Sequence, residues 1–304
     1  MDMHRKTDGP WRYTFADVHL VSDVPLPDLQ PASGNHAPLH VNWADHLPPV
    51  APEWYHRWGD EQEEWARFGA TAEGWVVVFP ALAEFRIPLA ADAVIVCPGP
   101  DVPAHTVVHL LLNQVLPLVL SRSGRLVLHA GAVAIDGRIV AFVGPTGSGK
   151  STLVAACARA GAEVVCDDSL VVYRQGAQWV GVPSYPALRL WQSSLDRVGW
   201  AGEGQPAAHY THKRRVGTAT GQWRFADGPR AFTRLVLLEH DLPQRPVAVE
   251  LFSQVFRLDV RDLQEAVRLF HLVGDLARDL DITRLGPRES RDAVAIADAL
   301  CLRA

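Results

Sequence analysis

The chain has few cysteines, no apolar signal core at residues 1–6 and no long apolar stretch free of polar residues. Cysteine occurs four times without C-x-x-C spacing, which predicts reduced core thiols of a cytosolic protein. Residues 1–6 are polar and lead into no apolar signal core. The most apolar long stretch, residues 107–120, contains polar residues and a proline, so we expect it to be too short and too polar to span a membrane. These features predict a soluble, cytoplasmic protein without a membrane partner.

Charge and composition limit the possible partners and the number of domains only modestly. A net charge of -5 over 304 residues, spread along the chain, gives no reason to expect a nucleic-acid partner. An apolar fraction of 48% supports a full hydrophobic core. No internal repeat or low-complexity tract is visible, and the length suggests two domains or one large one.

The chain changes character near residue 100. Residues 1–102 are rich in proline and tryptophan and contain short β-like runs at 11–21, 39–43, 74–80 and 85–88, which predict a small β-rich domain with a structural or substrate-docking role. Residues 103–304 read as an α/β core, with a helix from about 107, a strand at 125–135 and a hairpin turn at Asp136-Gly137. Further strands are expected at 163–166, 234–239 and 247–258, and helices at 262–276 and 288–302.

The most informative stretch is a glycine-rich loop that fits G-x-x-x-x-G-K-[ST]. An apolar, β-branched run (138–143) precedes it, and a helical pattern ending before Gly161 follows. Strand, loop and helix in this order predict a phosphate-binding loop rather than a glycine-rich turn with a chance lysine. Its residues are Gly144, Pro145, Thr146, Gly147, Ser148, Gly149, Lys150, Ser151 and Thr152.

Such a loop binds a nucleoside triphosphate for physical reasons. Glycines allow backbone N–H groups to turn towards the phosphates, and the helix N-terminus adds partial positive charge. We expect Lys150 to reach the β- and γ-phosphates and the Ser151 hydroxyl to ligate Mg²⁺. The predicted cofactors are therefore ATP and Mg²⁺.

An acidic pair, Asp167-Asp168, ends the next buried strand. We expect this strand to lie beside the strand of the phosphate-binding loop, with the pair at the edge where ligands bind. One carboxylate would accept a hydroxyl proton while the other holds the metal or its water. We take Asp168 with Ser151 as metal ligands, but the sequence leaves open which of Asp167 and Asp168 is the base. The alternative is a turn that merely begins the next loop. A rival acidic residue is Glu239, which ends the apolar run 235–238 as a Walker B carboxylate would and would indicate an ordinary hydrolysing ATPase.

Three segments together carry a family resemblance: Leu128-His129-Ala130-Gly131-Ala132-Val133, residues 144–152, and Val164-Val165-Cys166-Asp167-Asp168. Their combination resembles the catalytic domain of HPr kinase/phosphorylase, and more closely the HPr-kinase-like peptide serine kinases associated with ribosomally made peptides, including lasso-peptide clusters. The strong match covers roughly residues 125–175. The resemblance implies a P-loop kinase core of the HPr kinase C-terminal-domain type and a homo-oligomer.

The resemblance also implies ATP-dependent phosphorylation of a serine in a peptide or protein. In this resemblance, Asp167 and Asp168 would supply the base, Lys150 would hold phosphate, and His129 would lie beside them. Without the family context, the better interpretation of His129 is a histidine on a buried strand whose hydrogen bonds are all made within the protein. HPr kinases carry a Glu-Leu-Arg-Gly element later in the chain. Here Arg189 matches its arginine, but Ala187 stands where its glutamate would be. Without a glycine-rich docking signature for HPr, a ribosomally made precursor peptide is the favoured substrate.

The densest basic cluster follows in Lys213, Arg214 and Arg215. With Arg189, it is a candidate for gripping the substrate or neutralising the transferred phosphoryl group, although a solvated charge cluster explains it equally well. Two other functions fit the phosphate-binding loop. One is a small-molecule kinase, and the other is a nucleotide-gated regulatory ATPase that transfers phosphate to nothing.

Overall fold

The computed structural model describes residues 10–32, 37–60, 63–238, 245–286 and 292–302. The rival residue Glu239 lies outside these ranges. The chain forms two compact units, which we call unit 1 (residues 1–124 and 257–262) and unit 2 (residues 125–256 and 263–304). This division differs from a boundary at residue 102, because the helix after residue 103 and a short segment near residue 260 both belong to unit 1. The expected mixed α/β class is confirmed.

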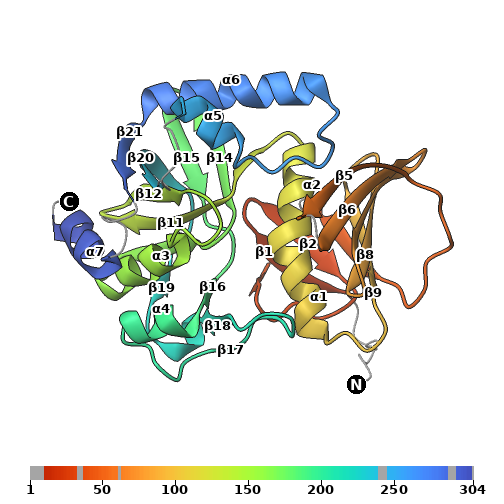
Figure 1. The fold of residues 1–304 in the computed structure, drawn as a ribbon, viewed down its shortest axis with the longest axis horizontal. Coiled ribbons are helices and arrows are strands. Elements are labelled where there is room, and N and C mark those ends of the chain that lie inside the picture. Colours follow the sequence, from red (N-terminus) through yellow and green to blue (C-terminus); the bar gives the residue numbers. More distant parts are fainter. Residues whose placement is uncertain (1–9, 33–36, 61–62, 239–244, 287–291, 303–304) are drawn as a thin grey trace. The chain divides into compact units, whose positions relative to one another are not determined.

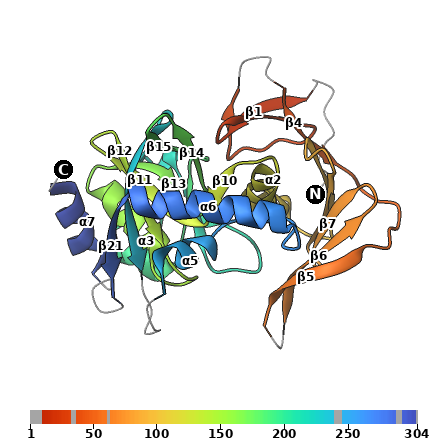
Figure 2. The same cartoon turned by 90° about the horizontal axis from the view of Figure 1, so that it is seen from above.

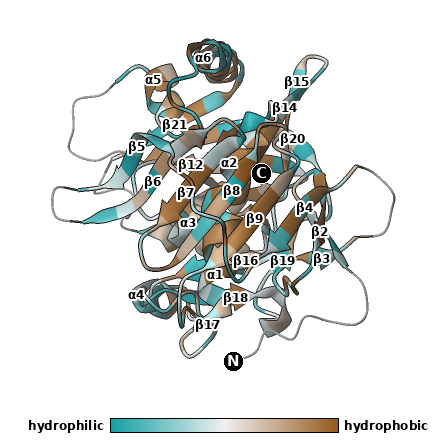
Figure 3. Ribbon diagram, turned by 90° about the vertical axis from the view of Figure 1, so that its right-hand side faces the viewer, coloured by the Kyte–Doolittle hydropathy of each residue, from teal (hydrophilic) through white to brown (hydrophobic). Residues whose placement is uncertain are grey.

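The described part of unit 1 contains a nine-stranded sheet in the order β3-β1-β2-β4-β9-β8-β7-β6-β5. Strands β5, β6 and β7 run side by side and antiparallel (Figure 2). Apolar residues concentrate on β7, β8 and β9 (Figure 3), and Phe68, Phe85 and Val94 are fully buried. The strands are β1 (Trp11–Phe15), β2 (Val18–Ser22), β3 (Gln30–Pro31), β4 (Leu39–Trp43), β5 (Glu53–Gly59), β6 (Glu64–Thr71), β7 (Gly74–Phe79), β8 (Ala83–Pro88) and β9 (Ala93–Pro98).

One helix accompanies this sheet. It runs without a break through α1 (Ala104–Leu110), a π-helical turn η1 (Leu111–Val115) and α2 (Leu116–Arg122). Pro117 has no N–H to donate to the preceding turn, which accounts for the local widening. Within the described residues this is a helix long and apolar enough to cross a membrane by length and composition, so the expectation that the run is too short was wrong. Of its 18-residue apolar window, 78% is buried in the protein, as is also found for the core helix of a globular domain.

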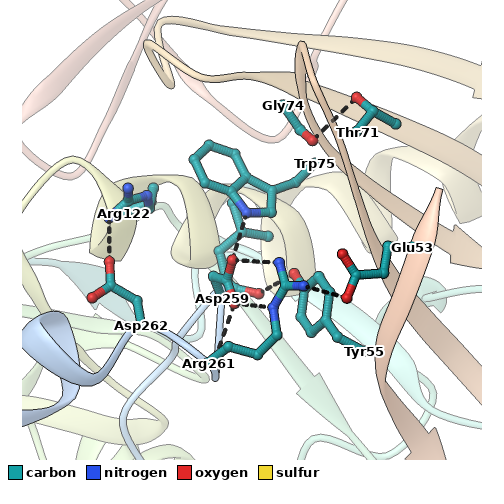
Figure 4. A network of polar contacts seen from close by, with 10 residues as sticks. Glu53, Tyr55, Thr71, Gly74, Trp75, Arg122, Asp259, Arg261 and Asp262 are labelled. Atoms are coloured by element: carbon teal, nitrogen blue, oxygen red, sulfur yellow. Dashed lines mark hydrogen bonds and ion pairs between the residues drawn. The ribbon is translucent and has the colours of Figure 1, made fainter.

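A short segment, residues 257–262, interrupts unit 2 and is held in unit 1 by polar contacts (Figure 4). The Tyr55 hydroxyl donates to Leu258 O at 2.7 Å, and Trp75 Nε1 donates to Asp259 Oδ2 at 3.2 Å. The guanidinium of Arg261 stacks over the Tyr55 ring at 4.1 Å. Because these contacts form inside unit 1, a segment from late in the chain completes the N-terminal unit.

Unit 2 is built on a second nine-stranded sheet, in the order β10-β14-β15-β20-β12-β11-β13-β19 with β21 beside β20, and on a three-stranded sheet β16-β18-β17. Helices α5 and α6 cover one face of the large sheet, and α3 and α7 cover the other (Figure 1). Strand β12 is apolar on both faces for this reason: Phe142 packs towards α3, whereas Ala141 and Val143 pack towards α6.

The bounds of the unit 2 elements are as follows. The strands are β10 (Leu126–Leu128), β11 (Ala130–Ile135), β12 (Arg138–Val143), β13 (Glu163–Cys166), β14 (Leu170–Gln175), β15 (Gln178–Val182), β16 (Ala187–Leu190), β17 (Gln205–Pro206), β18 (Arg214–Gly217), β19 (Arg224–Phe225), β20 (Arg230–Leu238) and β21 (Asp281–Leu285). The helices are α3 (Lys150–Arg159), α4 (Gln192–Arg197), a 3₁₀ turn η2 (Thr218–Thr220), α5 (Val247–Phe252), α6 (Leu263–Asp279) and α7 (Ala293–Leu302).

Several local predictions match these elements. Asp136 and Gly137 both have positive φ (48° and 73°), as a type I′ hairpin turn requires. Helix α3 begins at Lys150 and is followed by Gly161 with φ 104°, the left-handed residue typical of a helix C-terminus. The strand expected at 247–258 is wrong, because its first half is helix α5 and only Val255 makes a β-bridge, with Leu128.

Candidate active site

The candidate site lies at one edge of the large sheet in unit 2. Strand β11 is antiparallel to both β12 and β13, and its register pairs Ala130 with Val143 and Ala132 with Cys166. The C-terminal ends of β12 and β13 and the N-terminal end of β11 therefore meet at the same edge. The expectation that β13 lies directly beside β12 was wrong, because β11 separates them. The acidic pair still reaches the loop, since β12 and β13 run in the same direction.

The glycine-rich loop connects β12 to α3. Gly147 and Gly149 have φ of 83° and 98°, a left-handed conformation that favours glycine. Lys150 Nζ donates to Gly144 O at 2.7 Å and to Pro145 O at 3.1 Å, which places the ammonium within the loop. Gly144 also allows close packing, because a Cβ there would lie 2.7 Å from Leu238 O. The loop is thus built as a compact turn around one lysine.

Thr152, the last residue assigned to the loop, faces helix α4. The Thr152 hydroxyl is 2.8 Å from the Ser194 hydroxyl of α4, and both side chains are buried. This hydrogen bond ties α3 to α4. Thr152 therefore has a structural contact, whereas Ser151, one residue earlier, is close enough to the Asp167 carboxylate to lower its pKa by hydrogen bonding.

The two aspartates have different surroundings. Asp167 is almost fully buried, with 1% of its side chain exposed, whereas 18% of the Asp168 side chain is exposed. Burial and the neighbouring Asp168 carboxylate together raise the pKa of Asp167 to about 6, although Arg189 and Ser151 act to lower it. Burial also acts to raise the pKa of Asp168, but Arg189, His129 and Lys213 outweigh it and hold that pKa well below its usual range. Asp168 therefore stays ionised to lower pH than Asp167, and it is the more accessible member of the pair.

Arg189 holds both aspartates from strand β16. Its backbone N–H donates to Asp167 Oδ2 at 2.7 Å, and its Nη2 donates to Asp168 Oδ2 at 2.8 Å. Its Nη1 donates to the Tyr185 hydroxyl. Only 3% of the Arg189 side chain is exposed, and these contacts orient the acidic pair. Its role in substrate binding stays a prediction.

His129 lies at the break between β10 and β11. Its backbone N–H donates to Gln254 O at 2.7 Å, and its ring packs at a tilt against Phe256 with centroids 5.9 Å apart. Burial lowers its pKa to about 4, although Asp168 acts to raise it. The imidazole is therefore neutral near pH 7, and it lies close enough to Asp168 to influence its charge.

The three residues of the basic cluster separate in the fold. Lys213 influences the pKa of Asp167, Asp168 and Lys150, so it lies near the site. Arg214 Nε instead donates to Glu203 O at 2.9 Å.

Arg215, the residue after Arg214, donates from Nη2 to Gln205 Oε1 at 3.3 Å. The contacts of Arg214 and Arg215 join β18 to residues 203–205, whereas Lys213 lies near the acidic pair. Ala187, which replaces the glutamate of the HPr kinase element, is buried opposite Gly217.

Sequence reasoning missed Tyr185 and Phe256. Tyr185 is buried and accepts from Arg189, and burial raises its pKa to about 12. Its only signal in the sequence was its position just before Arg189. Phe256 fell within a segment expected to be a strand, so nothing pointed to a contact with His129.

The residue types at this edge suit a magnesium ion. The described residues contain no group of three or more histidine, cysteine, aspartate or glutamate side chains that could hold a metal alone. Mg²⁺ in phosphoryl-transfer sites usually needs only one or two protein oxygens beside phosphate and water. Asp167 Oδ1 is buried without a hydrogen bond that meets normal geometry, and the Ser151 hydroxyl is close to this carboxylate. A hydroxyl and a carboxylate oxygen are the donors that Mg²⁺ prefers.

Comparisons with known proteins add little to this geometry. No protein-family model matches the chain, and no curated protein matches it. Among solved structures, the chain is similar to the HPr(Ser) kinase/phosphatase from Coxiella burnetii, with 18% sequence identity and a TM-score of 0.27 over 40% of this chain and 71% of that chain. Similarity at this level does not establish a shared fold or a shared activity.

Proposed function

We propose that the protein is an ATP-dependent kinase that transfers the γ-phosphoryl group to a hydroxyl. The observation that carries this proposal is the meeting of Lys150, the Asp167-Asp168 pair and His129 at one sheet edge. Asp168 acts to raise the pKa of Lys150, so the lysine that would hold phosphate and the carboxylate that would accept a proton lie near each other. Phosphoryl transfer needs such positioning and charge stabilisation more than covalent catalysis by the protein.

The two aspartates take different roles in this proposal. A general base must come within hydrogen-bond distance of the proton that it accepts. Asp168 meets this requirement better, because it is more exposed and lies towards Lys150, Lys213 and His129. Asp167 is nearly inaccessible to a substrate hydroxyl, but its carboxylate lies beside the Ser151 hydroxyl. We therefore assign Mg²⁺ binding to these two residues. This reverses the expectation that Asp168 holds the metal. When bound, Mg²⁺ would neutralise charge on the phosphates.

The acceptor is proposed to be a serine of a peptide or protein, with a ribosomally made precursor peptide favoured over HPr. Support for this finer statement comes from the sequence resemblance at residues 128–133, 144–152 and 164–168. A homo-oligomer is proposed from the same resemblance, whereas a cytoplasmic location without nucleic-acid or membrane partners is proposed from the composition and charge of the chain. The charged groups around Asp168, including Lys213, would stabilise the transferred phosphoryl group.

The test uses purified full-length protein, Mg²⁺, γ-labelled ATP and a panel of serine-containing peptides. Asp168→Asn should lower transfer by about 10²-fold or more, since it removes the proposed base. Lys150→Ala should weaken ATP binding as well. Asp281→Asn is the matched control, because Asp281 also accepts from an arginine at 2.8 Å but on the surface.

Each outcome separates one function from another. Label on a peptide serine that disappears in Asp168→Asn supports the proposal. Label on a small metabolite would instead indicate a small-molecule kinase. ATP binding without transfer would indicate a nucleotide-gated regulator. Hydrolysis that survives Asp168→Asn but is lost in Glu239→Gln would favour the rival ATPase.

A further inference from the structure

Two of the four cysteines meet at the end of the sheet opposite the candidate site. Cys157 belongs to α3, the helix that follows the phosphate-binding loop, and is fully buried. Cys301 belongs to α7 and is half-buried against the same core cluster. The two side chains pack in the same core cluster, close enough for a thiol–thiol hydrogen bond to shift the pKa of each. Two thiols from helices far apart in the sequence are thus in direct contact.

A cavity of about 280 Å³ opens beside Cys301. It is lined by the hairpin turn at Asp136 and Gly137 and by the residues that follow α3, including Gly161 and Glu163. Cys157 does not line it. Small solutes can therefore reach one thiol of the pair, while the other stays behind it in the core.

The contact makes the two thiols chemically unequal. The hydrogen bond from Cys157 lowers the pKa of Cys301, with burial opposing the effect. The same hydrogen bond raises the pKa of Cys157, and burial raises it further. The thiolate is the reactive form of cysteine, so the accessible Cys301 is the better nucleophile and Cys157 is its partner.

We propose that Cys157 and Cys301 form a redox-sensitive pair in which a hydroperoxide oxidises Cys301 and the product is a disulfide between α3 and α7. The Cys301 thiolate attacks the O–O bond of hydrogen peroxide, becomes a sulfenic acid, and releases hydroxide, which takes up a proton to give water. The Cys157 thiol then attacks the Cys301 sulfur, and the S–OH bond breaks as a second water leaves with the Cys157 proton. Two thiols are oxidised by two electrons, and one peroxide is reduced to two waters.

The disulfide would join the C-terminal helix covalently to the helix of the phosphate-binding loop. The two helices already pack together in the core cluster that contains Leu153, Val154 and Ala297. A cross-link between them restricts the unfolded chain, so the thermal midpoint of unit 2 should rise on oxidation and return when a reductant is added. This proposal does not depend on the kinase function.

The test treats the full-length folded protein with hydrogen peroxide and maps its peptides without reductant. We expect a linked peptide pair containing Cys157 and Cys301, lighter than the two separate peptides by two hydrogen atoms. Cys301→Ser and Cys157→Ala should each abolish the link and the shift in thermal midpoint. Cys97→Ser, which alters a half-buried cysteine of unit 1, is the control and should keep both.

The proposal is overturned if the wild-type protein leaves Cys157 as a free thiol while Cys301 is unmodified or proceeds to a sulfinic acid. It is also overturned if Cys157 or Cys301 links to a different cysteine. The wild-type result decides the question even if Cys157→Ala fails to fold, and Cys301→Ser tests the same link from the more exposed side.

Discussion

Arg189 Nη2 lies 2.8 Å from Asp168 Oδ2, while the backbone N–H of the same arginine donates to Asp167 at 2.7 Å. One residue therefore contacts both carboxylates of the acidic pair. Because Arg189 and Asp167 are nearly inaccessible to water, water molecules do not compete for the hydrogen bonds between them. The orientation of the pair thus depends on a strand, β16, that lies outside the large sheet.

Replacing Arg189 should lower the free energy of unfolding considerably. Arg189→Met keeps most of the side-chain volume but leaves two carboxylates in a buried site without their cation, and we expect a loss of about 3–5 kcal/mol in the free energy of unfolding. Arg234→Met is the control, since it removes an exposed ion pair of the same 2.8 Å length and should cost about 1 kcal/mol or less. Urea unfolding measures both, and equal losses would contradict the role assigned to Arg189.

Gly131 on β11 is required by close packing. A Cβ at this position would lie 2.7 Å from Val154 Cγ2 of α3 and 3.3 Å from Asp167 O. Gly131→Ala should therefore push α3 away from the sheet and lower stability by about 1–3 kcal/mol. Phosphate transfer should fall too, because α3 carries the loop.

Gly274→Ala provides the comparison. Gly274 lies in α6, nothing comes within 4 Å of its added Cβ, and alanine should raise helix stability by about 1 kcal/mol. Thermal unfolding of both variants should move in opposite directions. A Gly131→Ala variant as stable as the wild type would mean that α3 does not approach β11 as closely as described.

His129 should make the protein less stable in acid. Its folded pKa is about 4, below the ordinary 6.5, so the folded state favours the neutral ring. Between these two values the unfolded state binds more protons, and stability is lost as pH falls below about 6.5 until the folded pKa is reached. At about pH 5 the loss from this residue is about 2 kcal/mol.

The measurement compares urea unfolding of the wild type and of His129→Gln near pH 7 and near pH 5. The variant lacks this titration, so its stability relative to the wild type should improve at the lower pH. Other titrating groups, including Asp167, are present in both proteins and largely cancel. An unchanged difference between the two pH values would show that His129 titrates normally.

Two neighbouring hydroxyls of α3 should behave differently. Thr152→Val removes the hydrogen bond to Ser194 and should lower stability by about 1 kcal/mol with ATP affinity nearly unchanged. Ser151→Ala should instead weaken Mg²⁺-dependent ATP binding with a smaller effect on stability. Calorimetry with Mg·ATP and unfolding by urea distinguish the two, and a large loss of ATP affinity in Thr152→Val would return that residue to the nucleotide site.

Local sequence patterns predicted several parts of the candidate site correctly. The Asp136-Gly137 dipeptide predicts the hairpin that joins β11 to β12, since few other residues adopt two positive φ angles in succession. The glycine pattern and the following apolar residues predict a helix that begins at Lys150. Both are determined by interactions between residues close in sequence.

Longer-range contacts overrode local preference elsewhere. The run Val247–Phe252 contains two valines and a phenylalanine, which favour a strand. It nevertheless forms α5, in which Leu251 joins the same core cluster as Leu269 and Phe252 contacts Phe270 with ring centroids 5.4 Å apart. The placement of Arg189 was also beyond sequence reasoning. A basic residue that matches a motif appears available to a substrate until the fold shows it buried between two carboxylates.

Local sequence preferences alone specify the glycine-rich loop between β12 and α3 and the hairpin before it, because glycine conformation and turn chemistry act over a few residues. Contacts between distant segments place β11 between β12 and β13, bring Arg189 to Asp167 and Asp168, and set Ser151 beside Asp167. They also let residues 257–262 complete unit 1. These relationships join residues distant along the chain, and they depend on strand order and burial, which local preference does not specify.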